Sequence, residues 1–167
     1  LLGFVAATPA GYSAAMFYSI VYAVTAMGAF GLVILLGRAG FEADRLEHFK
    51  GLGERSPWFA FLTLVLMLSM AGVPPFVGFW AKWSVLAQVV AAGDVWLALA
   101  AVLFAVVGAF YYLRVVWYAY FDEPVEKAPV ATGRPLGSML SANALLVLAL
   151  GVYPGALMSL CAFAIGA

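Results

Sequence analysis

Long runs of apolar residues, separated by short polar segments, make up most of this chain. A helix of roughly 20 residues crosses a bilayer core of about 30 Å, and each of the main runs is at least about that long. The runs end at Gly37 and the charges after it, at Gly93-Asp94, in the proline-containing segment 122–134, and at Pro154-Gly155. The predicted membrane spans are therefore 12–37, 57–92, 95–121 and 136–153, with a short apolar tail after the last one.

The second run, 57–92, is interrupted near 72–78, in the sequence Ala71-Gly72-Val73-Pro74-Pro75-Phe76-Val77-Gly78. Two prolines remove backbone donors and two glycines loosen the adjoining turns, so helical hydrogen bonding should fail there. Lipid cannot satisfy the freed carbonyl groups. We therefore expect the break in the bundle interior or beside a hydrated cavity.

The basic residues test whether 57–92 crosses the membrane once or twice. Apart from Lys82 and Arg114, which lie within the predicted spans, they fall in the loops 38–56 and 122–134, and the turn at Gly93-Asp94 has none. One interrupted crossing would put both basic loops on the same side, which the positive-inside rule favours. As one continuous helix, the segment would be about 54 Å long at about 1.5 Å per residue. Its halves must therefore tilt, protrude or pass beside one another.

Composition supports a membrane protein. Of 167 residues, 66% are hydrophobic and 10% are charged, and the mean hydropathy is +1.07. The predicted fold class is all-α, a polytopic transmembrane helix bundle of about four spans, one of them discontinuous, surrounded by a lipid bilayer. Eight basic and eight acidic residues cancel, so nucleic acid is not an expected partner. Because the chain starts without an initiator Met, we expect it to be a piece of a longer polypeptide.

Lys82 is the candidate functional residue, because it is the only charge between Arg55 and Asp94. A lysine at the centre of a membrane helix costs about 2.5 to 3.5 kcal/mol, and such residues usually mark ion paths or paired networks. A buried lysine also exchanges its proton more readily than an exposed one. The alternative is that Lys82 snorkels to the membrane interface, with Trp80 and Trp83 as aromatics of the interfacial belt.

Other polar side chains within the predicted spans are weaker candidates. Tyr18, Tyr22 and Thr25 fall at i, i+4 and i+7 on one helical face, where their hydroxyls could hold water beside a proton path. Hydrogen bonds between helices, without any role in transport, are the alternative interpretation. Arg114, near the end of 95–121, is interpreted as a snorkelling anchor or as a member of an ion pair.

Several sequence blocks resemble one family, the antiporter-like membrane subunits of respiratory complex I, and among these the N-type subunits. The blocks are Tyr22-Ala23-Val24-Thr25-Ala26-Met27-Gly28-Ala29-Phe30-Gly31, Phe49-Lys50-Gly51-Leu52, Leu68-Ser69-Met70-Ala71-Gly72-Val73-Pro74-Pro75, Gly78-Phe79-Trp80-Ala81-Lys82-Trp83, Tyr111-Tyr112-Leu113-Arg114-Val115-Val116 and Gly151-Val152-Tyr153-Pro154. M-type subunits carry a glutamate at the place of Lys82, and L-type subunits usually follow their lysine with acidic residues. Here Trp83 and Ser84 follow it, and Ala81 stands where many relatives have glycine.

The resemblance implies a C-terminal fragment in which 57–92 is the family's discontinuous helix and Lys82 is its lysine on the proton path. It implies proton translocation within a NADH-quinone oxidoreductase, an enzyme whose electron transfer takes place in other subunits. FMN and iron-sulfur clusters would sit in those partner subunits, and this chain would hold no cofactor. Subunit M and the small subunit K are the implied neighbours, in the bacterial inner (plasma) membrane. Two alternatives remain: a subunit of a multisubunit cation/proton antiporter, and a purely structural membrane subunit.

Overall fold

The computed structural model describes residues 2–37, 46–124 and 134–166. Within these ranges the regular elements are α-helices and one short 3-10 helix, η1, and there is no strand. In chain order they are α1 (Leu2–Val5), α2 (Pro9–Leu36), η1 (Leu46–Phe49), α3 (Leu52–Arg55), α4 (Pro57–Ala71), α5 (Val77–Ala91), α6 (Val95–Phe121), α7 (Arg134–Val152) and α8 (Gly155–Ile165).

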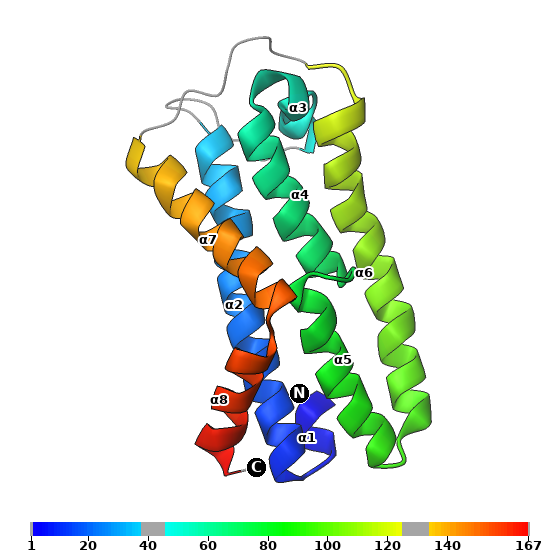
Figure 1. The fold of residues 1–167 in the computed structure, drawn as a ribbon. Coiled ribbons are helices and arrows are strands. Elements are labelled where there is room, and N and C mark those ends of the chain that lie inside the picture. The colour runs from blue at the N-terminus through cyan, green and yellow to red at the C-terminus, as the bar shows by residue number, and fades with distance from the viewer. Residues whose placement is uncertain (1, 38–45, 125–133, 167) are drawn as a thin grey trace.

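The longer helices form four columns that run along the bundle (Figure 1). Two columns are single helices: α2 has 28 residues and α6 has 27, so each is about 40 Å long. The other two columns are broken, one into α4 and α5 and the other into α7 and α8 (Figure 1). Three helices, Pro9–Leu36, Val95–Phe121 and Pro135–Val152, are long and apolar enough to cross a membrane.

The helix ends follow local chemistry. The first long helix begins at Pro9, three residues before the predicted start at 12, because the Thr8 hydroxyl accepts the N–H of Gly11 at 3.0 Å and Pro9 occupies the first turn. The predicted apolar tail after Pro154 is a helix, α8, which packs against α2. The chain therefore contains a second interrupted helix column, of which the sequence predicted the break at Pro154-Gly155 but not the helical form of the tail.

Gly72 ends α4 in a left-handed conformation, with φ of 84°. Its N–H donates to the carbonyl oxygens of Leu68 and Ser69, and the N–H of Val73 donates to Leu68 at 3.0 Å. This pattern is a Schellman motif, which suits a glycine because an L side chain is strained at positive φ. The motif satisfies two of the last four carbonyl groups of α4 and leaves those of Met70 and Ala71.

The two halves of the broken column overlap around the break. A Cβ atom placed on Gly78, in the first turn of α5, would run into the backbone carbonyl of Ser69, near the end of α4. The N–H of Gly78 also donates to Ser69 Oγ at 3.2 Å, and Ser69 is fully buried. The halves therefore pass beside one another at their ends, which was one of the three ways expected to shorten this segment.

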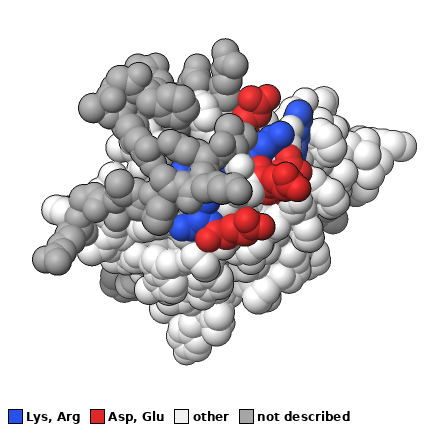
Figure 2. Space-filling view, turned by 90° about the horizontal axis from the view of Figure 1, so that it is seen from above, with Lys and Arg blue, Asp and Glu red and all other residues white. Residues whose placement is uncertain are grey.

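The polar connections lie at one end of the bundle. Figure 1 shows η1, α3, the end of α6 and the start of α7 at this end, whereas the Gly93-Asp94 turn lies at the other. Figure 2 shows acidic and basic side chains next to one another at the same end. Three of the basic residues, Arg38, Arg45 and Lys127, fall outside the described residues.

Candidate functional site

Lys82 caps the carboxyl end of the other half-helix. Its Nζ donates to the carbonyl oxygens of Met70 at 3.0 Å and Ala71 at 2.8 Å. These are the two carbonyl groups that the Schellman motif at Gly72 leaves without a donor. A lysine on α5 therefore completes the hydrogen bonding at the end of α4, and the negative end of the α4 dipole stabilises its ammonium group.

The ammonium group lies inside the bundle. Lys82 is about 18 Å along the helix from Asp94, which is more than half of a bilayer core of about 30 Å. Side chains on a helix lean toward its amino end, and the amino end of α5 is at the break, near the middle of the bundle in Figure 1. The long side chain of Lys82 therefore extends toward the break and away from the nearer end of the bundle.

Lys82 also borders two cavities. The smaller one, of about 30 Å³, lies between α2, α4 and α5 and has room for about one water molecule. The larger one, of about 520 Å³, lies between α1, α2, α5 and α6 and has mostly apolar walls. Four residues line both cavities: Tyr18, Tyr22, Met70 and Lys82. Neither lining contains a carboxylate from the part of the chain that the structure describes.

The three polar candidates on α2 take different positions. Tyr18 and Tyr22 stack with ring centroids 6.3 Å apart, and both line the two cavities beside Lys82. Thr25 is buried and borders the smaller cavity, but its hydroxyl donates to the Val21 carbonyl of its own helix at 2.7 Å. Two tyrosines and Lys82 thus come together, whereas the Thr25 hydroxyl proton is already engaged within α2.

Two residues near Lys82, Ser69 and Tyr112, were not singled out from the sequence, and Trp80 was considered only as an aromatic of the interfacial belt. Ser69 binds the first turn of α5, Tyr112 of α6 lines the larger cavity, and the Trp80 indole N–H donates to the Gly151 carbonyl of α7 at 3.1 Å. Each belongs to one of the sequence blocks that resemble the family, which was the only signal for Ser69 and Tyr112. Among the residues that the structure describes, no three His, Cys, Asp or Glu side chains are grouped as metal ligands would be.

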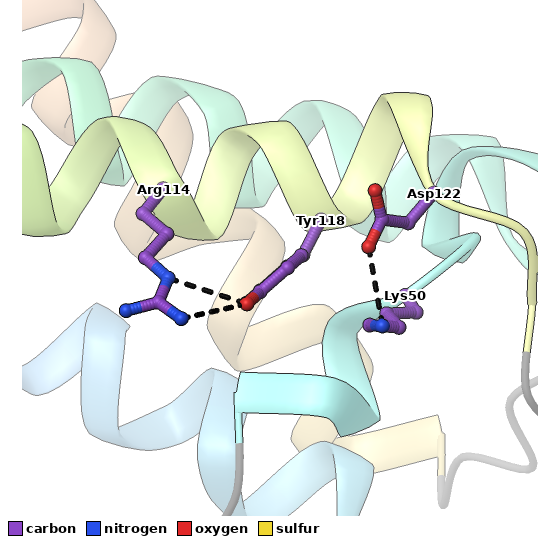
Figure 3. A network of polar contacts seen from close by, with 4 residues as sticks. All are labelled: Lys50, Arg114, Tyr118 and Asp122. Atoms are coloured by element: carbon purple, nitrogen blue, oxygen red, sulfur yellow. Dashed lines mark hydrogen bonds and ion pairs between the residues drawn. The ribbon is translucent and has the colours of Figure 1, made fainter.

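A second polar cluster, at the polar end of the bundle, is separate from Lys82. Lys50 forms an ion pair with Asp122 at 3.3 Å, and its Nζ lies 5.2 Å from the ring centre of Tyr118 (Figure 3). Arg114 donates to the Tyr118 hydroxyl from Nε at 3.2 Å and from Nη2 at 2.9 Å. The cluster attaches the segment that carries Lys50 to the end of α6, and Arg114 is bonded to the tyrosine at its centre.

Comparisons with known proteins match both the sequence and the fold. The family of NADH:quinone oxidoreductase/Mrp antiporter transmembrane segments matches residues 1–108. NADH-quinone oxidoreductase subunit N of Thiobacillus denitrificans is 58% identical over 99% of this chain, and that of Herminiimonas arsenicoxydans is 58% identical over 95%. The chain spans only 34% and 32% of these two relatives, about a third of their length.

A chain in a structure of respiratory complex I from Thermus thermophilus with bound aureothin has the same fold. Its TM-score is 0.79 at 28% sequence identity, over 94% of this chain and 36% of that one. The predicted all-α transmembrane bundle with a discontinuous helix is confirmed, and so is the resemblance to N-type subunits. The chain belongs to the NADH:quinone oxidoreductase/Mrp antiporter transmembrane family.

Proposed function

We propose that this chain is part of a proton-translocating membrane subunit of a NADH-quinone oxidoreductase, in which Lys82 alternates between its protonated and neutral forms. The supporting observation is the position of the ammonium group, on two backbone carbonyls inside the bundle and between two cavities. A neutral amine would keep hydrogen-bond donors for these carbonyls, so the site tolerates both protonation states.

Tyr18, Tyr22 and Thr25 form the supporting polar surface in this proposal. Tyr18 and Tyr22 line the cavities that Lys82 shares, so water held there would connect these tyrosines with its amine. In this proposal, α4 and α5 together make one crossing of the membrane. The described polar connections before α4 and after α6 lie at the same end of the bundle, as a single crossing requires (Figure 1).

The remaining parts of the proposal concern the whole protein. The subunit lies in the bacterial inner membrane beside other complex I subunits, with subunit M and the small subunit K as neighbours. Flavin and iron-sulfur clusters belong to partner subunits, and electron transfer there drives the proton steps at Lys82. The names of the relatives, which are subunits of NADH-quinone oxidoreductase, support this assignment.

A second candidate is a subunit of a cation/proton antiporter, because the matching family also covers antiporters of the Mrp type. In that case Lys82 would serve an exchange of cations for protons without any NADH-linked partner. The two candidates separate in one assay: proton movement in membrane vesicles follows NADH oxidation in the first, and an imposed sodium gradient in the second.

The deciding experiment replaces Lys82 in the full-length subunit of the assembled complex, reconstituted in vesicles. Lys82→Arg keeps N–H donors for the carbonyls of Met70 and Ala71 but does not release its proton. Lys82→Met removes both the donors and the charge. We expect both variants to pump fewer protons per NADH oxidised, and the arginine variant to assemble normally.

Lys50→Met is the matched control, since it removes a lysine from the polar end of the bundle, away from both cavities. It should pump normally. If Lys82→Arg also pumped normally, the amine would be needed only as a cap for α4, and the structural interpretation of the subunit would replace the proposed one.

A further inference from the structure

Two side chains of α5 reach the carboxyl ends of two different broken helices. Lys82 donates to the last carbonyl groups of α4, and the Trp80 indole N–H donates to the Gly151 carbonyl near the end of α7 at 3.1 Å. The break between α7 and α8 is thus joined directly to the start of α5.

The contact at Gly151 is tight as well as polar. Gly151 is buried, and a Cβ atom there would lie 2.7 Å from Pro75 O and 2.7 Å from Val77 N, both backbone atoms. The helix ends one residue later, and Pro154 has no N–H to continue the hydrogen bonding. Trp80 therefore supplies a donor at a helix end where carbonyl groups lack helical partners.

Trp80 and Lys82 together fix the rotation of α5 about its axis. Residues two apart on an α-helix point about 200° apart, so the two side chains leave the helix on nearly opposite sides. One is bonded to α7 and the other to α4. Loss of the Trp80 bond would let the start of α5 rotate or shift, and Lys82 would then move relative to the carbonyl groups of Met70 and Ala71.

We propose that Trp80 is a positioning residue for Lys82, which it keeps aligned with the end of α4 and with the two cavities through its bond to Gly151. This inference rests on the proposed function of Lys82. Through Gly151, it also links the α4–α5 break to the end of α7, next to the α7–α8 break.

The test uses the full-length subunit in the assembled complex, reconstituted in vesicles, with protons pumped per NADH oxidised measured across a range of pH. Trp80→Phe keeps an aromatic ring and removes the N–H. Since one hydrogen bond contributes about 1 kcal/mol, its loss should shift the equilibrium between aligned and displaced Lys82 by about fivefold, and we expect pumping per NADH to fall, with a changed pH profile. Trp83→Phe, on the 59% exposed tryptophan of the same helix, should leave both unchanged.

Trp80→His provides the rescue. The histidine Nε2 lies two bonds from Cγ, as the tryptophan Nε1 does, so a ring N–H stays within reach of Gly151. This variant should pump more protons per NADH than Trp80→Phe. Should both variants give less assembled complex but normal pumping per NADH and a normal pH profile, Trp80 would be only a packing residue and the proposal would be overturned.

The double variant Trp80→Phe/Lys82→Met separates this proposal from the one on which it rests. If Trp80 acts through Lys82, the double variant pumps as Lys82→Met does alone. A further loss would overturn the positioning role. Normal pumping by Lys82→Met would overturn the proposed function, whereas impaired pumping by Lys82→Met together with normal pumping by Trp80→Phe would overturn only the role of Trp80.

Discussion

The side-chain amide of Asn143 on α7 donates to the carbonyl oxygen of Val24 on α2 at 3.1 Å. Its own oxygen, Oδ1, is buried without a hydrogen-bond partner and points at Gly28. A Cβ atom on Gly28 would run into Oδ1 and would lie 2.8 Å from Leu66 Cδ2. The absence of a side chain at Gly28 therefore lets α2, α4 and α7 meet.

Gly28→Ala should destabilise the bundle by about 1 to 3 kcal/mol, because the new methyl group forces helices apart or side chains out of their preferred rotamers. Thermal unfolding of the purified full-length subunit in detergent would measure the loss. Gly155→Ala is the control, since no other atom lies within 4 Å of a Cβ at that exposed position. An equal shift in both variants would contradict the packing assigned to Gly28.

Gly28→Ala and Asn143→Ala should not be additive. Removal of the amide frees the space that the new methyl group needs, so the double variant should be more stable than the sum of the two single losses predicts. The expected interaction energy is about 0.5 to 3 kcal/mol, measured by the same thermal unfolding. Strict additivity would mean that the two residues do not share this contact.

Gly78→Ala should impair both assembly and pumping. Its Cβ would meet the backbone of Ser69, which cannot rotate away, so α4 and α5 must separate at the break. Lys82 would then lose its reach to the carbonyls of Met70 and Ala71. We expect less assembled complex and fewer protons per NADH in what does assemble, against the Gly155→Ala control. Normal assembly and pumping would show that the two halves do not need their overlap.

Tyr22→Phe and Thr25→Val should differ in their effect on pumping. Tyr22 lines both cavities, whereas the Thr25 hydroxyl donates to Val21 of its own helix. Each substitution removes one hydroxyl and nearly preserves the volume. We expect slower proton pumping in Tyr22→Phe and little change in Thr25→Val, measured at equal NADH oxidation. If Thr25→Val lost more proton pumping than Tyr22→Phe, the polar path would have to be assigned to the smaller cavity, which Thr25 lines.

Lys50→Met should change the free energy of unfolding by less than about 1 kcal/mol, because an ion pair with partly exposed partners contributes little. Lys50 and Asp122 are 29% and 25% exposed. The small stabilisation should shrink as salt is added, which thermal unfolding at low and high ionic strength would detect. A loss well above this range would mean that the segment carrying Lys50 depends on this one contact.

The sequence by itself determined which of the long segments are helical, apart from α8, and where the second run breaks. Apolar length, Pro74-Pro75 and the neighbouring glycines act through the local backbone, so they predict helices and their ends without knowledge of the neighbours. Lys82 could be identified for a similar reason, since a single charge in an apolar run is visible in the sequence without knowledge of its contacts.

Only the tertiary structure decided what Lys82 touches. Its contact with Met70 and Ala71 depends on the overlap of two half-helices, which close packing at Gly78 allows. The same holds for the bond from Trp80 to Gly151 and for the bond from Asn143 to Val24. These contacts follow from how helices far apart in the chain are placed against one another, and helical periodicity carries no information about that placement.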